Sequence, residues 1–193
     1  HADALHFDLW HKGRNVLRDG GSYSYNCSEP WRSYFPGTQS HNTIEFDGRD
    51  QMPRIGRFLF GAWTKGETNE PLSQCDGSLS WSGAYTDYAG CRHQRTIRVQ
   101  GDCWHVTDVI SGFKKKAVLR WRLEPGQWTL EDNVCRGKDV SIEIDSDVAA
   151  LELSLTDGWE SRYYMEKSRL PVLEVLIKDN PAEIQTVIRL SES

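Results

Sequence analysis

Residues 5–21 read LHFDLWHKGRNVLRDGG, and this stretch predicts a β-hairpin. Every second residue from Leu5 to Leu9 is apolar, which is the period expected of a strand with one buried face. Residues 11–14 contain a glycine and read as a turn, and the run over residues 15–19 returns from it as the partner strand. The opening of the chain therefore favours an antiparallel β fold.

The rest of the chain repeats this pattern of short strands separated by turn residues. Asp47-Gly48, Gly101-Asp102 and Pro125-Gly126 are dipeptides typical of turns. We expect strands over residues 43–46, 95–99, 104–110, 118–123, 141–144, 149–155, 172–177 and 184–190. About ten or more strands with hardly any helical periodicity predict an all-β fold, an antiparallel two-sheet β-sandwich or barrel. We take the sandwich, with residues 1–193 as one domain.

Composition excludes several classes of protein. The chain has 23 Lys and Arg residues against 28 Asp and Glu residues, and its net charge of −5 argues against nucleic acid as a partner. No apolar run approaches the roughly 20 residues that a membrane helix needs, so a membrane is not expected as a partner either. The 8 Trp, 7 Tyr and 6 Phe residues argue against a disordered chain.

The cysteines and the first residues bear on the context of the chain. Five scattered cysteines leave at least one thiol unpaired within the chain, which fits buried free thiols better than a full disulfide framework. The chain begins His-Ala-Asp-Ala-Leu, without an initiator Met or a signal-peptide pattern, and this opening reads like the middle of a strand. We therefore expect a fragment of a longer protein.

Two histidines and one aspartate form a candidate metal site. His1 opens the first strand, Asp19 ends its partner, and His41 ends a long aromatic segment, residues 23–40, just before the next strand. Two imidazoles and one carboxylate suit zinc, and Asp3 is a candidate second-shell hydrogen-bond acceptor for a ligand imidazole. The alternative interpretation is that Asp19 is a turn residue and His41 a polar strand cap.

Several short motifs in one order resemble the C-terminal β-sheet region of the heparinase II/III-like polysaccharide lyases. The resemblance is strongest over residues 1–51 and weakens after about residue 130, where it rests on the strand pattern alone. The motifs are His1 to Leu5, Arg18 to Tyr25, Tyr34 to Thr38, His41 to Thr43, Asp47-Gly48 and Asp50-Gln51, followed more loosely by Arg92 to Arg95, Trp104 to Asp108 and Trp121 to Gly126.

The resemblance implies a parent enzyme with an N-terminal helical toroid domain, absent here, and a C-terminal β-sandwich. Members cleave uronic-acid-containing polysaccharides such as heparin, heparan sulfate or alginate by β-elimination, and often bind zinc. His1, Asp19 and His41 match the family's metal residues. The resemblance also implies an acidic polysaccharide as partner, a periplasmic or secreted bacterial protein, and an isolated fragment that is inactive because the toroid residues are missing.

The resemblance also names candidate catalytic residues. Some members take a catalytic tyrosine from the loop between the metal aspartate and the second metal histidine, and Tyr25 is the best match, with Tyr34 as alternate. The alternative is that both tyrosine rings pack the loop against the sheet and have no catalytic role. Independently of the resemblance, Arg49 and Arg54 are candidate substrate-binding residues because guanidinium groups pair with carboxylates and sulfates; a solvated loop is the alternative.

Two other functions remain open from the sequence. A non-catalytic carbohydrate-binding β-sandwich would use its aromatic side chains to stack on sugar rings, with a purely structural metal. A cupin-like metal enzyme would also carry His and carboxylate ligands on β-strands. Cupins usually place two ligands as His-x-His within one strand, and this chain has no such pair.

Overall fold

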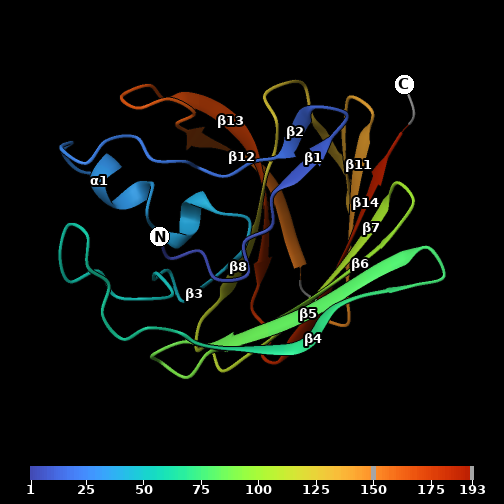
Figure 1. Ribbon diagram of the computed structural model, residues 1–193, viewed down its shortest axis with the longest axis horizontal. Helices are drawn as coiled ribbons and strands as arrows, with labels where there is room; N and C mark the ends of the chain where they lie inside the picture. The colour runs from blue at the N-terminus through green and yellow to red at the C-terminus, as the bar shows by residue number, and fades with distance from the viewer. Residues whose placement is uncertain (149–150, 192–193) are drawn as a thin grey trace.

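The computed structural model describes residues 1–148 and 151–191, and these residues form two packed antiparallel sheets with a small hairpin beside them (Figure 1). The larger sheet has the strand order β4-β5-β6-β7-β14-β11-β10-β9, and the smaller one has the order β12-β13-β8-β3. The predicted all-β sandwich is therefore confirmed, and the only α-helix in the described residues is the short α1, Trp31–Tyr34.

The strands of the larger sheet are β4 (Lys65–Cys75), β5 (Ser78–Thr86), β6 (Arg92–Gln100), β7 (Cys103–Ser111), β14 (Ala182–Leu190), β11 (Val140–Ser146), β10 (Val134–Gly137) and β9 (Thr129–Glu131). Those of the smaller sheet are β12 (Leu151–Glu160), β13 (Ser168–Ile177), β8 (Ala117–Arg122) and β3 (Ile44–Phe46). The hairpin pairs β1 (Leu9–His11) with β2 (Arg14–Leu17), and a 3-10 helix spans Thr38–Ser40.

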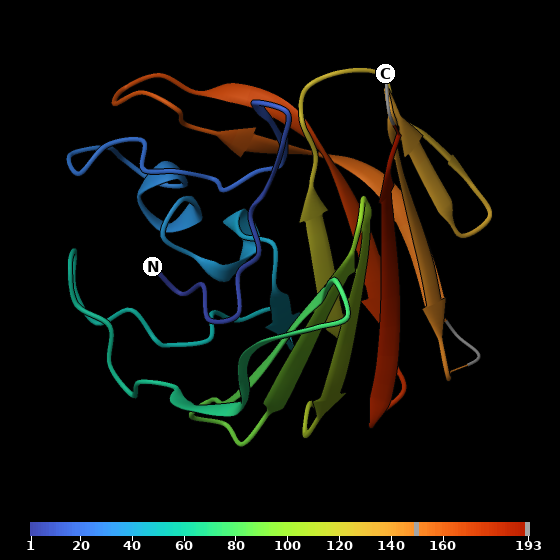
Figure 2. The ribbon, with the colours of Figure 1, turned by 45° about the vertical axis from the view of Figure 1, so that its right-hand side comes forward.

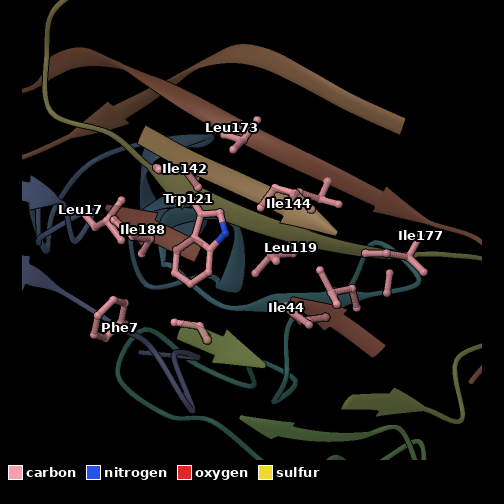
Figure 3. Close-up of a cluster of buried hydrophobic side chains, with 14 of the residues drawn as sticks. Phe7, Leu17, Ile44, Leu119, Trp121, Ile142, Ile144, Leu173, Ile177 and Ile188 are labelled. Carbon is pink, nitrogen blue, oxygen red and sulfur yellow. The ribbon is translucent and has the colours of Figure 1, made fainter. Parts of the chain in front are cut away.

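The core lies between the two sheets and is built by the period of two along their strands. In β14 every second residue from Ala182 to Leu190 is buried, because successive side chains point to opposite faces of a sheet. Trp121 of β8 is fully buried at the centre of the core, surrounded by aliphatic side chains from both sheets (Figure 3). Truncating such a buried ring costs about 3 to 5 kcal/mol of unfolding free energy.

Most expected strands are present, with edges shifted by a few residues. Two residues of the expected strand 149–155, Ala149 and Ala150, lie outside the described residues. The sequence prediction missed β4 and β5 as well as the short β9 and β10. All eleven residues of β4 are exposed, so this strand has no buried face and no apolar alternation from which to predict it.

The expectation that His1 opens a strand is wrong. Residues 1–8 contain no strand, and Leu5 adopts a left-handed conformation with φ 59° that interrupts the extended chain. The backbone N–H groups there donate outside any sheet, from Ala2 to the Pro36 carbonyl at 2.8 Å and from Ala4 to the Gln51 side chain at 2.7 Å. The first residues are therefore an ordered loop that packs on two other loops.

The loops that precede β4 gather on one side of the sandwich (Figure 2). Residues 1–8, the segment with α1 and the 3-10 helix, and residues 47–64 lie there, and the turn that joins β12 to β13 borders the segment that precedes α1. The rigid sheets thus present a cluster of loops at one end, which is where function concentrates in folds of this kind.

Candidate functional site

Three histidines and two aspartates meet in the loop cluster. Nδ1 of His41 lies 2.8 Å from Oδ2 of Asp19, and Nε2 of His6 lies 3.4 Å from the same oxygen. The ring of His41 is 5.2 Å from that of His1 and 5.5 Å from that of His6, measured between centroids. Two metal-compatible groups result, one of His1, Asp3 and His41 and the other of His6, Asp19 and His41.

Close backbone contact brings Asp19 and His41 together. The N–H of Gly20 donates to the carbonyl of Ser40 at 2.9 Å, and a Cβ on Gly20 would lie only 2.6 Å from that oxygen. Gly21 has φ +72° and packs against Ser161 so closely that a side chain would clash with its carbonyl. Glycine is therefore required at both positions, because Ser40 packs against Gly20 and Ser161 packs against Gly21 with no room for a side chain.

Asp19 is held as a carboxylate by two hydrogen-bond donors. Its two oxygens accept from the backbone N–H of Gly21 and from Nδ1 of His41, while Nε2 of His6 lies 3.4 Å from Oδ2 without forming a hydrogen bond. Burial alone raises the pKa of the Asp19 carboxyl, but the hydrogen bond and charge of His41, with the Gly21 N–H, outweigh burial and lower this pKa to about 2. Asp19 therefore carries its negative charge at neutral pH.

His6 is neutral and its proton position follows from its contacts. The backbone N–H of Asn42 donates to Nδ1 of His6 at 2.9 Å, so Nδ1 is unprotonated and the ring proton lies on Nε2, facing Asp19. Burial lowers the pKa of His6 to about 4, although Asp19 opposes this shift. His6 thus presents a neutral Nε2–H group near Asp19, without a hydrogen bond between them.

His41 offers an unused nitrogen. Because a carboxylate only accepts hydrogen bonds, Nδ1 of His41 carries the proton that points at Asp19, and in the neutral form of the ring Nε2 has a lone pair. The side chain of His41 is fully buried, and Nε2 has no hydrogen-bond partner among the described residues. A buried imidazole nitrogen of this kind, oriented by a carboxylate behind it, is the arrangement found for histidine ligands of zinc.

The structure brings the predicted metal residues together in part. His41 contacts Asp19 directly and lies beside His1, but neither metal-compatible group in the described residues contains both His1 and Asp19. Asp3 joins the group of His1 and His41. His6 was missed because the alternation from Leu5 assigned it to the solvent face; the left-handed turn at Leu5 instead directs its side chain inward.

A pocket of about 180 Å³ opens beside His1. Its walls are aromatic and basic, and no described residue that lines it carries a carboxylate. The lining residues are His1, Ser22, Tyr23, Ser24, Tyr25, Trp31, Arg32, Phe35, Pro36, Arg54, Arg57, Phe58 and Phe60. Two residues predicted for catalysis and substrate binding, Tyr25 and Arg54, therefore share one pocket with His1.

The two candidate tyrosines have different surroundings. Tyr25 is 56% exposed, and its ring lies 5.5 Å from that of Phe58. The Tyr34 hydroxyl lies outside the pocket and accepts hydrogen bonds from the backbone N–H of Trp159 at 2.9 Å and from Arg122 at 3.2 Å. These contacts give Tyr34 a packing role and leave Tyr25 as the tyrosine available to a ligand.

The two candidate arginines also differ. Arg49 lies outside the pocket, where it pairs with Asp87 at 2.6 Å and packs on the ring of Tyr88. Arg54 lines the pocket, and its guanidinium donates to the backbone carbonyls of Gly56 at 3.1 Å and Arg57 at 2.7 Å. Arg54 therefore contributes positive charge to the pocket while holding the shape of its own loop.

The turn between β12 and β13 supports the wall that carries Tyr25 (Figure 1). The N–H of Met165 donates to the Tyr23 carbonyl at 2.8 Å, and the Tyr164 hydroxyl lies 3.3 Å from the backbone nitrogen of Tyr25. Nζ of Lys167 lies over the rings of Tyr23 at 4.8 Å, Trp31 at 4.9 Å and Trp159 at 5.9 Å. No sequence pattern indicated this aromatic cage, because its members are far apart in the chain.

A family model described as "Heparinase II/III-like, C-terminal" matches residues 1–180. A search of curated proteins found no match. Within residues 1–148 and 151–191, no helix has the length and apolar character needed to cross a membrane.

Two solved structures share the fold. A heparinase III with methylated lysines has a TM-score of 0.84 at 19% identity, and the match covers 100% of this chain and 30% of that chain. The heparan sulfate lyase HepC from Pedobacter heparinus has a TM-score of 0.80 at 17% identity, with coverage of 100% of this chain and 31% of that chain. The chain thus spans less than a third of the length of these proteins.

Proposed function

The chain belongs to the heparinase II/III-like C-terminal family, and from this premise we propose that it is the C-terminal β-sandwich of a polysaccharide lyase. In this proposal the parent enzyme cleaves a uronic-acid-containing polysaccharide, such as heparan sulfate or alginate, by β-elimination. The sandwich supplies a zinc site and one wall of the substrate cleft.

The observation that carries the proposal is the pocket beside His1. Its rings suit stacking on sugar faces, and its three arginines without a lining carboxylate suit an anionic sugar. The net charge of the whole chain is −5, so this basic character is local to the pocket. An acidic polysaccharide is therefore the proposed ligand. We propose that the pocket binds one sugar residue of it.

The proposed metal residues are His1, Asp19 and His41, with Asp3 as a hydrogen-bond acceptor for a ligand imidazole. The fit rests on the buried, unpartnered Nε2 of His41 and on a donor set of imidazole nitrogens and carboxylate oxygens. A bound zinc ion would supply positive charge beside the pocket. Asp19 stays ionised at neutral pH, as a metal-binding carboxylate must.

Tyr25 is the proposed proton-transfer residue of this chain. In a β-elimination the proton leaves the carbon beside the carboxylate, the bond to the glycosidic oxygen breaks, and that oxygen takes up a proton. The exposed Tyr25 phenol at the pocket suits such transfer, and the Arg54 charge favours binding of the substrate carboxylate. The contacts of Tyr34 and Arg49 support packing roles, so the proposal relies on Tyr25 and Arg54.

The proposal assigns the remaining catalytic groups to another part of a longer protein, an N-terminal helical toroid. The chain covers 30% and 31% of the two lyase chains described above, which leaves room for such a domain in relatives. We also propose a periplasmic or secreted location, on the ground of the family resemblance alone. The isolated chain is then expected to bind its polysaccharide but not to cleave it.

Glycan binding and turnover by the chain test this proposal. Calorimetry with heparan sulfate and alginate oligosaccharides, against a neutral dextran oligosaccharide, is expected to show binding of an acidic ligand only. Tyr25→Ala is expected to weaken binding about tenfold through lost ring contact, whereas Tyr88→Ala, an exposed tyrosine outside the pocket, leaves it unchanged. Equal binding of dextran, or robust formation of unsaturated uronate by the isolated chain, would contradict the proposal.

A carbohydrate-binding module is the second candidate function. The exposed rings of Tyr25 and Phe58 at the pocket favour it, because stacking on sugars requires no chemistry. Tyr25→Phe in the intact parent protein separates the two candidates. Loss of elimination with binding retained supports the lyase, whereas a parent protein that binds acidic glycans without any elimination supports the module.

A further inference from the structure

One fully buried arginine contacts both histidine-bearing segments of the site. Arg95 of β6 makes two hydrogen bonds to Asp108, Nε to Oδ1 at 2.7 Å and Nη2 to Oδ2 at 3.0 Å, and packs over the Trp121 ring. Its remaining nitrogen, Nη1, donates to the backbone carbonyls of Leu5 and Asn42, both at 2.7 Å. Leu5 directly precedes His6, and Asn42 directly follows His41.

Asn42 extends these contacts to the third segment of the site. Its backbone N–H donates to Nδ1 of His6 at 2.9 Å, and its side-chain Nδ2 donates to the carbonyls of Phe7 at 2.8 Å and Arg18 at 3.3 Å. Its Oδ1 accepts from the backbone N–H of Arg122 at 2.6 Å. Every polar group of this fully buried residue is therefore in use.

We propose that Arg95 and Asn42 form a positioning unit that fixes His6, Asp19 and His41 relative to one another. Arg95 ties residue 5 to residue 42, and Asn42 ties both to residue 18, so each of the three side chains is attached next to an anchored backbone group. Asp108, and through it His93, hold the guanidinium in place from the sheet. The proposal deepens the metal site of the proposed function, but the hydrogen bonds that carry it exist without a metal.

The unit also dictates where the ring protons lie. The N–H of Asn42 keeps Nδ1 of His6 unprotonated, and the placement of residue 18 brings Asp19 to Nδ1 of His41. These two contacts select the Nε2–H form of His6 and the Nδ1–H form of His41. A buried arginine that served the sandwich core alone would have no influence on the tautomer of either ring.

The test compares one substitution at the fully buried Arg95 and at the partly buried Arg120. Arg95→Lys keeps a positive charge opposite Asp108, but an ammonium lacks the fork that reaches Asp108 and two carbonyls together. Arg120→Lys is the control, because Arg120 pairs with Glu45 and Glu174 and has no hydrogen bond to residues 5, 6, 41 or 42. The readouts are the ring tautomers, from long-range ¹H–¹⁵N NMR of the chelator-treated chain at pH 8, and Zn²⁺ affinity by competition titration.

The unchanged chain is expected to show the Nε2–H form of His6 and the Nδ1–H form of His41. Arg95→Lys is expected to give mixed tautomers and zinc affinity about 10- to 100-fold weaker, while Arg120→Lys changes neither. A folded Arg95→Lys chain with unchanged tautomers would overturn the proposal, and so would equal losses in both variants.

A second variant keeps the test decisive if Arg95→Lys does not fold. Asn42→Asp preserves the shape and the backbone contacts of residue 42 but replaces the donors to Phe7 and Arg18 with a carboxylate. It is expected to disturb the His41 tautomer, and an unchanged His41 signal would overturn the proposal. If the unchanged chain binds no Zn²⁺, the metal part of the proposed function fails, while the tautomers still decide the role of Arg95 and Asn42.

Discussion

Nδ1 of His41 lies 2.8 Å from Oδ2 of Asp19, at the point where the segment after β2 touches the segment before β3. This hydrogen bond directs the Nδ1 proton of the His41 ring to the carboxylate. The buried Nε2 then has no hydrogen-bond partner among the described residues and is available as a metal ligand. A pocket with aromatic and basic walls opens beside the neighbouring His1. The metal-compatible cluster and the pocket are therefore parts of one site.

Lys167 is expected to hold the pocket wall in place. Lys167→Met removes the ammonium from the three rings of its aromatic cage, and we expect the free energy of unfolding to fall by about 1 kcal/mol. Limited proteolysis should then cleave residues 22–36 faster. The control is Lys178→Met, whose exposed pair with Glu152 is worth about 0.5 kcal/mol or less. Equal proteolysis of the two variants would show that the cage does not order the wall.

Acid stability is expected to depend on Asp108. Burial raises the pKa of its carboxyl, but Arg95 and His93 outweigh burial and lower this pKa to about 2, from an unfolded value near 3.8. The stabilisation, about 2 kcal/mol, is fully present above about pH 4 and is lost as the pH falls through 2.

Urea unfolding between pH 5 and pH 2 measures this dependence. Asp108→Asn is expected to be less stable at pH 5, because Arg95 is left buried and unpaired, and to lose less stability on acidification. Asp157→Asn, an exposed carboxylate paired with Arg169, is the control with little change. The prediction fails if Asp108→Asn retains the full acid-dependent loss.

The thiols are expected to react according to burial. All five cysteines are free, Cys75 is exposed, and Cys91 and Cys135 are buried. Burial raises the pKa of the Cys135 thiol to about 11, so almost no reactive thiolate exists at pH 8. Iodoacetamide followed by mass spectrometry should label Cys75 first and leave Cys91 and Cys135 unlabelled in the native chain. Early labelling of Cys135 would contradict the packing of the core around it.

Substitutions of Tyr34 and Tyr25 are expected to differ in their effect on the stability of the chain. Tyr34→Phe removes the acceptor of the Trp159 N–H and of Arg122, which should lower the free energy of unfolding by about 1 to 3 kcal/mol. Tyr25→Phe should change it by less than about 0.5 kcal/mol, because Tyr25 is exposed. Urea unfolding of both variants measures the difference, and a larger loss for Tyr25→Phe would reverse their assigned roles.

Much of the fold was predictable because buried strands carry a local signal. The alternation in β14 follows from burial of one face, and the sequence shows it directly. The exposed β4 has no such signal, since all its residues face solvent and its place in the sheet is set by pairing with β5. The alternation of apolar residues over residues 5–9 wrongly predicted a strand at the start of the chain. The backbone hydrogen bonds of Ala2 and Ala4 to other loops outweigh the local preference for a strand there.

From the sequence, the candidate site was predictable only where side chains that can bind a metal lie near the ends of expected strands. Asp19 and His41 were found in this way and lie in contact. His6 was missed because its inward direction depends on the turn at Leu5, and Arg95 because it reaches residue 5 across 90 positions of the chain. Such long-range hydrogen bonds leave no pattern in a local stretch of sequence, so only the folded chain shows them.

Zinc content, measured together with thermal stability, tests the central claim most directly. After equilibration with Zn²⁺ and dialysis at pH 7.5, elemental analysis should find one zinc per chain, and a chelator should lower the melting temperature. Binding at a hundredfold excess over Kd adds about 2.7 kcal/mol to the free energy of unfolding. Asp19→Asn and His41→Gln should lose both the zinc and the shift, whereas His105→Gln, an exposed histidine on β7, keeps them. A chain without stoichiometric zinc, whose melting temperature is the same with and without chelator, would contradict the account.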